Sequence, residues 1–449
     1  MALSKLPRRH WPSVLHFGRC QRALQTDAPI AESTRLFGPT RTKRDRNWNG
    51  LSHPHPIQST TYRDQLCPRP IHTKAVLTSL ASNNDNNTHT RDMAMEEKLQ
   101  SVGFREWLAA AYPWTRAPLI VGAPMRVMSG PELAVAVSRA GGFGFIGPGE
   151  KPESTAADLE TAKGLIADSG IEYPGPVLPI GVGFQIWNGN VDVSASAVLE
   201  YRPAAAWLFA PRHGQTDVDV WTKRLREASP ETKIWLQIGT LQEALDAARS
   251  ASPPDVLVVQ GAEAGGHGRA SDGIGFITLL PEIADATRGS GIPLIAAGGV
   301  ADGRGVVAAL GVGAAGVSMG TRFLASQEAR IKKGYQDEVV RAMDGGASTA
   351  RTHLYNHLRG TFGWPEQFSP RTIVNRSWEE QQAGTAFEDI KKRHDEAVSK
   401  GDAAWGPQGW TATYAGANVG LIRNVARAGE IVEGARDEAA KIIEALSGL

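Results

Sequence analysis

The chain has 449 residues, with 48 lysines and arginines against 47 aspartates and glutamates, so no overall charge points to nucleic acid or another highly charged partner. Hydrophobic residues make up 41% and glycines number 49, which is typical of a soluble globular chain with many turns. No run approaches the roughly 18 to 20 apolar residues that span a bilayer, so no membrane association is expected. The two cysteines, Cys20 and Cys67, lie near the N-terminus, which argues against a disulfide scaffold, a thiolate zinc site or any other metal site built on cysteine.

Residues 1–95 differ from the rest and are predicted to be a disordered extension, because they are polar, aperiodic and poor in apolar residues. Five basic residues precede the first acidic residue, Asp27, as in organellar transit peptides, although Trp11-Pro12 interrupts any amphipathic helix there. Alternatively, translation starts at Met93 or Met95, just before the domain-like EEKLQSVGFREWLAAAY. We therefore expect a cytoplasmic protein, with a mitochondrial location as the alternative.

From Pro118 onward, short apolar runs alternate with segments of helical period. The predicted strands are 119–122, 142–146, 177–184, 205–209, 233–238, 256–260, 293–297 and 315–319. The predicted helices are 130–140, 154–167, 192–201, 218–228, 241–250, 276–287 and 303–310, with Thr240 as an N-cap. Eight strand–helix units in about 200 residues predict an α/β fold, a (β/α)8 TIM barrel, over residues 96–330.

In such a barrel the functional site lies at the carboxyl ends of the strands. The sixth strand leads directly into GAEAGGHGR, where Gly265 and Gly266 allow the backbone to approach a ligand closely and His267 supplies a titratable group. The last two strands lead into AAGGVADGRG and GVSMGTRFLAS, which fit the phosphate-binding loops that barrels commonly place there. The sequence therefore predicts that these two loops bind a phosphate and that His267 lies at the same end of the barrel.

Several of these stretches resemble the nitronate monooxygenase family, formerly called 2-nitropropane dioxygenases. They are GAPM (122–125), AGGFGFI (140–146), QGAEAGGHG (260–268), the glycine-rich block 296–326 and RGTFGWPEQFSPRTIVN (359–375). The resemblance implies an FMN-dependent barrel with an added C-terminal helical region, here residues 331–449. It implies oxidation of alkyl nitronates, and of nitroalkanes if they are accepted, by O2 to carbonyl compounds and nitrite.

The same resemblance assigns roles to individual positions. His267 matches the active-site histidine: protonated, it could hold the nitronate oxygens, and neutral, it could remove the α-proton of a nitroalkane. The implied FMN-binding positions are Ala123, Pro124, Met125, Gln185, Gln237, Gly265, Gly266, Gly298, Gly299, Ser318, Gly320 and Thr321. Ser318 replaces a larger amide side chain, and Arg126 replaces a small residue, so that it either adds a charge at the mouth of the site or points away.

Two other functions remain open at this point. An FMN-dependent enoyl-thioester reductase using NAD(P)H shares the barrel and much of the glycine pattern, although no strand-linked GxGxxG supports a separate nicotinamide site. A non-catalytic flavin-binding module is the alternative of another class, and the presence of His267 beside its glycines argues against it. An inosine-monophosphate-dehydrogenase-like enzyme is excluded, because it needs a cysteine in the active-site loops. A homodimer is the assembly considered, though the sequence does not fix it.

The tail beyond residue 330 is predicted to be helical. Residues 377–400 suggest an exposed helix pair or lid. Residues 430–446 suggest an amphipathic helix that packs on the barrel; its apolar side consists of Ile431, Val432, Ala435, Ala439, Ile442 and Ile443. Trp364 and the other tryptophans of the tail either line the substrate entrance or pack in a core.

Overall fold

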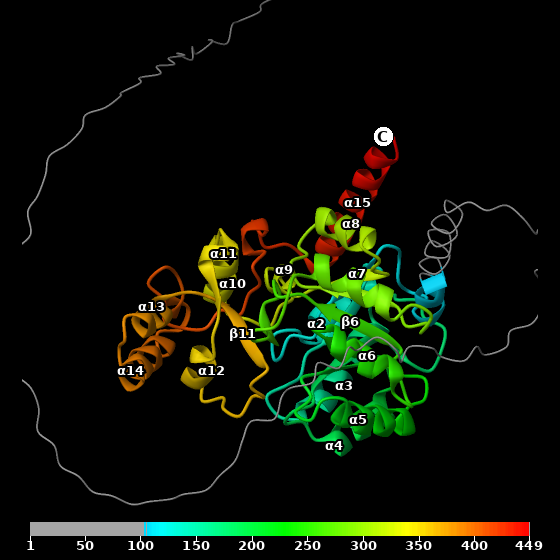
Figure 1. The fold of residues 1–449 in the computed structure, drawn as a ribbon, viewed down its shortest axis with the longest axis horizontal. Coiled ribbons are helices and arrows are strands. Elements are labelled where there is room, and N and C mark those ends of the chain that lie inside the picture. Colours follow the sequence, from blue (N-terminus) through cyan, green and yellow to red (C-terminus); the bar gives the residue numbers. More distant parts are fainter. Residues whose placement is uncertain (1–102, 105, 449) are drawn as a thin grey trace, which may run out of the picture. The chain divides into compact units, whose positions relative to one another are not determined.

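The computed structural model describes residues 103–104 and 106–448, so the predicted extension 1–95 lies outside the described residues. Eight parallel strands form a closed barrel with helices around it (Figure 1). The barrel strands are β1 (Leu119–Gly122), β2 (Phe143–Ile146), β3 (Leu178–Gln185), β4 (Pro203–Phe209), β5 (Lys233–Ile238), β6 (Val256–Gln260), β8 (Leu294–Ala297) and β9 (Gly316–Met319). β9 pairs back with β1 and closes the barrel. The predicted (β/α)8 barrel and all eight of its strands are confirmed.

The seven predicted helices are also present. They are α2 (Pro131–Arg139), α3 (Ser154–Ala167), α4 (Val191–Tyr201), α5 (Gln215–Ala228), α6 (Leu241–Arg249), α7 (Phe276–Ala286) and α8 (Gly303–Gly311). At the start of α6, Thr240 forms a capping box: its side chain accepts from the N–H of Glu243, whose carboxylate accepts from the N–H of Thr240. This confirms the predicted N-cap.

The barrel interior is filled by large aromatic side chains near the amino ends of the strands. Phe143, Phe145, Trp207 and Trp235 pack together, with the Trp207 and Trp235 rings 5.8 Å apart and stacked. Tyr112, which precedes β1, covers this end and accepts a hydrogen bond of 2.8 Å from the Trp235 indole. Because these rings fill one end, the interior is a packed core rather than a pore, and space for a ligand is left at the carboxyl ends.

A second, three-stranded sheet lies outside the barrel, in the order β10 (Thr349–Arg351), β11 (Phe368–Ile373) and β7 (Gly266–Arg269). β7 falls inside the stretch predicted as a glycine-rich loop, and it pairs antiparallel with β11, with His267 opposite Pro370. GHGR carries no apolar alternation, so its strand conformation depends on a partner about 100 residues away. This sheet joins the loop that carries His267 to the C-terminal region.

The remaining elements follow β9, the last strand of the barrel, and most of them belong to the tail. They are α9 (Thr321–Leu324), α10 (Lys333–Arg341), α11 (Gly345–Ser348), α12 (Leu354–Leu358), α13 (Arg376–Gln382), α14 (Phe387–Val398), η1 (Gly401–Ala404), η2 (Val419–Leu421) and α15 (Ala428–Ser447). α13 and α14 form the predicted helix pair and lie beside each other in Figure 1. α15 packs on α8 and α2, and four of its six predicted apolar residues are buried: Ile431, Val432, Ala435 and Ala439. The prediction is wrong for Ile443, which is exposed, and Ile442 is only half-buried, because both lie in the last turns of the helix, whose other residues are exposed. Within the described part of the chain, no helix has the length and apolar character needed to cross a membrane.

Candidate active site

One cavity opens at the carboxyl ends of the barrel strands, and every site residue predicted from the sequence lines it. These residues are Ala123, Pro124, Met125, Gln185, Gln237, Gly265, Gly266, His267, Gly298, Gly299, Ser318, Gly320 and Thr321. They come from the ends of six strands and from β7. The structure therefore brings together positions that are spread over about 200 residues of sequence.

The floor of the cavity follows from the two-residue period of the strands. Gln237 comes two residues after Trp235, and Gln260 two residues after Val258, so the inward positions change from apolar to polar at the carboxyl end. Trp207 Nε1 donates to Gln237 Oε1 at 3.0 Å. The amide nitrogen of Gln237 is therefore the group that remains for a ligand.

At one end of the cavity the surface is largely backbone. Gly298 and Gly299 have φ of 91° and 74°, and a Cβ on Gly298 would come within 3.0 Å of the backbone nitrogen and Cβ of Ala264. Only glycine adopts such a backbone there without strain. The chain therefore turns directly after β8, and the backbone of Gly298 and Gly299 lines the cavity.

Two hydroxyls face the same glycine-rich end. The hydroxyl of Ser318 is buried and has no hydrogen-bond partner among the described residues. Thr321 Oγ1 accepts from the N–H of Gly416 at 2.9 Å, which leaves its own proton for a ligand. A buried donor without a partner is costly, so this end fits a strong acceptor such as a phosphate.

The opposite wall is aromatic and carries His267. The His267 ring stacks on Trp364 with centroids 3.6 Å apart and planes 9° from parallel, and Trp187 lies 4.9 Å beyond Trp364. Trp364 thus lines the cavity, which was one of its two predicted roles. Stacking of this kind restricts rotation of the imidazole and fixes the direction of its nitrogens.

Burial, together with nearby basic groups, keeps His267 neutral. Its Nε2 lies 2.9 Å from Nδ2 of Asn356, and Oδ1 of that amide accepts from the Tyr414 hydroxyl at 3.3 Å. Burial, together with the positive charges of His353 and Arg351, lowers the pKa of His267 to about 3. Of the two protonation states considered from the sequence, the structure favours the neutral one, because no carboxylate of the described residues contacts the ring to stabilise an imidazolium.

Arginine side chains make the mouth of the cavity positive. Arg126 and Arg359 both line it, so Arg126 does not point away from the site. Burial, and then the charge of Arg359, lowers the pKa of Arg126, and its Nη2 donates to the carbonyl oxygen of Glu150 at 3.3 Å. Val127 follows in the left-handed region, with φ of 58°, a strained conformation for a β-branched residue. The positive charges of Arg126 and Arg359 favour anionic ligands.

The loop that carries His267 is held by two half-buried arginines. Arg351 donates to the carbonyl oxygens of Gly266 (3.3 Å), Ala262 (3.2 Å) and Ala264 (3.3 Å). Arg371, its neighbour in the sheet, also donates to the carbonyl of Ala262, at 3.0 Å. Burial, and then the charge of Arg371, lowers the pKa of Arg351 to about 10, so it remains a cation near neutral pH. These bonds satisfy carbonyls that the glycine-rich loop leaves unpaired.

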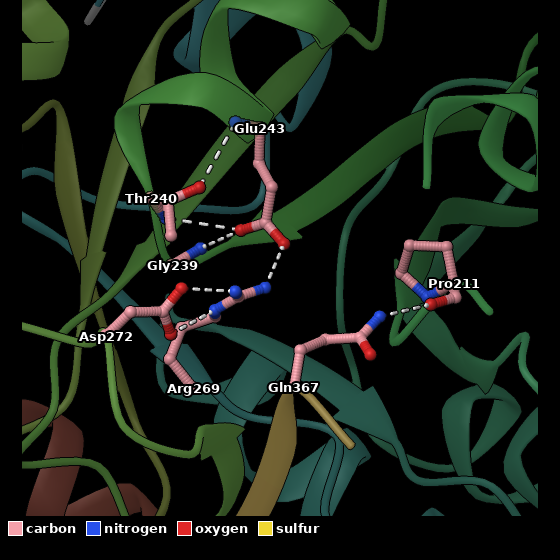
Figure 2. Close-up of polar contacts among 7 residues, drawn as sticks. All are labelled: Pro211, Gly239, Thr240, Glu243, Arg269, Asp272 and Gln367. Carbon is pink, nitrogen blue, oxygen red and sulfur yellow. Dashed lines mark hydrogen bonds and ion pairs between the residues drawn. The ribbon is translucent and has the colours of Figure 1, made fainter. Parts of the chain in front are cut away.

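A second anchor of β7 is formed by Arg269 (Figure 2). Arg269, two residues further along β7, donates to Glu243 at 2.9 Å and to Asp272 at 2.8 Å. Glu243 is the carboxylate of the α6 capping box and also accepts from the N–H of Gly239 at 2.7 Å. In the same view, the Gln367 amide donates to the carbonyl of Pro211 at 3.4 Å. The end of β7 is thereby tied to the start of α6.

Several residues at the His267 end were not identified from the sequence, namely Asn356, Arg359 and Tyr414. They lie far along the chain from His267, and a lone Asn, Arg or Tyr carries no local signal; Arg359 does begin the RGTFGWPEQF stretch that carries part of the resemblance. Three other histidines of the described residues do not line the cavity. His213 is exposed and pairs with Asp217, whereas His353 stacks near His357 at α12 and affects the site through its charge.

Comparisons with known proteins agree with this geometry. A family model described as nitronate monooxygenase matches residues 221–433. The nitronate monooxygenase npaC of Metarhizium robertsii is 61% identical over 341 residues, which cover 76% of this chain and 96% of the relative. A nitronate monooxygenase of Neurospora crassa is 34% identical, covering 74% and 92%. The crystal structure of nitroalkane oxidase from Streptomyces ansochromogenes superposes with a TM-score of 0.57 at 26% identity, covering 73% of this chain and 98% of that one.

Proposed function

Because this chain belongs to the nitronate monooxygenase family and is a flavin-dependent oxidoreductase of nitronates, we propose that its flavin is FMN, bound in the cavity described above. The phosphate would lie at the glycine-rich end, against Gly298, Gly299, Gly320 and Thr321. Two observations support this position: the buried Ser318 hydroxyl without a partner and the free proton of Thr321. The turn at Gly298 and Gly299, which lacks side chains, allows the close backbone approach that a phosphate needs.

The ring system of FMN would occupy the middle of the cavity. Ala123, Pro124 and Met125 would lie along it with their backbone, and Gly265 and Gly266 would leave room for it opposite. The amides of Gln185 and Gln237 are the polar groups available to its heteroatoms. For Gln237 the orientation is set, since its oxygen is already bonded to the Trp207 indole.

When bound, a flavin accepts electrons from the nitronate and passes them on to O2, which leads to a carbonyl compound and nitrite. The residues of this chain bind and orient the substrate. We propose that the nitronate lies between the flavin and His267, where Trp364 holds the imidazole in place. Arg126 and Arg359 attract the anion to the mouth of the cavity.

The observation that carries this proposal is that the two ends of one cavity have different chemistry. A glycine-rich surface with the unpartnered hydroxyl of Ser318 lies at one end, and a neutral, stacked histidine lies at the other. The enoyl-thioester reductase remains the alternative to be tested, together with a flavin-binding module that does not turn over. We also propose that residues 96–330 form the flavin-binding domain, that residues 331–449 close it, and that two copies assemble as a homodimer.

The proposal is tested with the purified full-length protein. Acid release of its cofactor should yield FMN, identified by mass, in about one equivalent per chain. With an alkyl nitronate, the enzyme should consume O2 and form nitrite and the carbonyl compound in equal amounts. Release of FAD would overturn the assignment of FMN. Activity with an enoyl thioester and NAD(P)H, but none with a nitronate, would instead establish the alternative.

A further inference from the structure

The two nitrogens of the His267 ring have different surroundings. Nε2 is 2.9 Å from Nδ2 of Asn356, whereas Nδ1 has no hydrogen-bond partner within residues 103–104 and 106–448. The ring lines the cavity, so Nδ1 is the nitrogen that remains for a ligand. In a neutral imidazole one nitrogen donates and the other accepts. The group that faces Nε2 therefore decides whether Nδ1 meets the substrate as a donor or as a base.

The orientation of the Asn356 amide is set by its second neighbour. Asn356 is only 2% exposed, and its Oδ1 accepts from the hydroxyl of Tyr414. The guanidinium of Arg359 lies over the Tyr414 ring, 5.5 Å from its centroid. A cation in this position draws electron density from the phenol, which makes its hydroxyl a better donor and a poorer acceptor. Oδ1 of Asn356 is thus directed to Tyr414, and its N–H to His267.

We propose that Asn356 is a positioning residue that holds His267 as the tautomer protonated on Nδ1, so that the enzyme selects nitronates over neutral nitroalkanes. The inference rests on the proposed function, in which His267 faces the substrate. Since Asn356 donates to Nε2, that nitrogen carries the lone pair and the single proton lies on Nδ1. Nδ1–H then meets the substrate as a hydrogen-bond donor.

The two forms of the substrate use this donor differently. The nitronate carries its negative charge on oxygens that accept the Nδ1–H bond, and no proton has to move. A neutral nitroalkane must first lose its α-proton: the C–H bond breaks, its electron pair delocalises onto the nitro group, and the proton needs a lone pair on Nδ1. That lone pair exists only if the Asn356 amide turns over, so that Oδ1 accepts Nε2–H and the bond from Tyr414 is lost.

The basic groups around the His267 ring keep it neutral, so what can differ is which of its two nitrogens carries the proton. His353 beside α12, Arg351 in β10 and Arg126 after β1 all oppose an imidazolium at His267. Arg359 at the end of α12 adds a further cation at the same cavity. Within the described chain, no carboxylate forms an ion pair or hydrogen bond with His267. The neutral ring therefore persists through the physiological pH range, and Asn356 chooses between its two neutral forms.

The tautomer can be read directly from the ring-¹⁵N NMR spectrum of the flavin-loaded protein labelled at histidine. The chain has 11 histidines, and the signals missing from His267→Ala identify those of His267. We expect a protonated Nδ1 and an unprotonated Nε2 near neutral pH. A proton on Nε2, or on both nitrogens, would overturn the proposal without affecting the evidence for flavin or for nitronate oxidation.

Two variants test the consequence for the substrate. In Asn356→Asp the carboxylate can only accept a hydrogen bond, so the proton of the neutral ring moves to Nε2 and Nδ1 gains a lone pair. The ratio of kcat/KM for nitroethane to kcat/KM for ethylnitronate should then rise by roughly tenfold or more. Its pH dependence should show the ionisation of the histidine. In Tyr414→Phe the amide loses its orienting donor, and the same ratio should rise by about threefold. An unchanged ratio in Tyr414→Phe, or in a folded, flavin-loaded Asn356→Asp, would contradict the proposal. If the wild-type enzyme did not oxidise the nitronate, that result would instead count against the proposed function.

Discussion

The two ends of the cavity are built in different ways. The glycine-rich end is made largely from backbone in one continuous stretch, residues 298–321, where Gly298 and Gly299 turn the chain with positive φ. The His267 end is made from side chains of four separate segments, with Asn356, Trp364 and Tyr414 around the ring. The first end depends on the conformation of the main chain, and the second on how a distant region docks. A substitution should therefore affect cofactor retention at one end and substrate handling at the other.

The largest effect on flavin retention is expected from Gly298→Val. The new Cβ would lie 3.0 Å from Ala264 in a backbone of φ 91°, so the turn must change and flavin retention should fall by about tenfold or more, with activity lost in proportion. Gly170→Val is the matched control, because Gly170 also has positive φ (71°) but would meet no atom within 4 Å. Flavin per chain is measured after gel filtration. Equal loss in both variants would show that backbone strain alone is responsible.

Trp364→Ala should affect the His267 end of the cavity alone, so that activity falls without loss of flavin. Without the stacked indole the His267 ring can rotate, and kcat/KM for a nitronate should fall by roughly tenfold while flavin content is unchanged. Trp364→Phe should restore most of the activity, because it keeps an aromatic face. Phe362→Ala is the control from the same loop, since Phe362 is 63% exposed. A loss of flavin in Trp364→Ala would remove the distinction between the ends.

The depressed pKa of His267 predicts how stability depends on pH. The unfolded histidine takes up a proton below about pH 6.5, whereas the folded one does so only near 3, so folding loses stability as the pH falls through this window. Wild type should therefore take up about one more proton on unfolding near pH 5 than His267→Ala. The pH dependence of denaturant unfolding measures this difference. Identical slopes for the two proteins would mean that the folded ring titrates normally.

The smallest effect is expected at the anchor of β7. Arg269→Gln removes the bond to Glu243, which loosens the strand two residues from His267 and should lower kcat by about threefold at unchanged flavin content. Lys333→Gln removes an exposed ion pair with Asp337 and should leave kcat unchanged. Reduced flavin binding in Arg269→Gln would show instead that this anchor supports cofactor binding.

The same contrast explains what could be read from the sequence. The barrel strands were predictable because buried parallel strands are continuous apolar runs, and Gly298, Gly299 and Gly320 mark the loops where the backbone must turn tightly. Gln237 lies at the end of such a run. Asn356 and Tyr414 were not predictable, because their role depends on the pairing of β7 with β11, and the segment GHGR gives no local sign of a strand.

The most direct test of the account is anaerobic rapid mixing of the flavin-loaded protein with an alkyl nitronate and, separately, with NAD(P)H. We expect the nitronate to bleach the flavin absorbance quickly in wild type and about 100-fold more slowly in His267→Ala, which should retain its flavin. NAD(P)H should have no comparable effect. Bleaching by NAD(P)H without any response to the nitronate would contradict the proposed function, and equal rates in wild type and His267→Ala would remove His267 from the reaction.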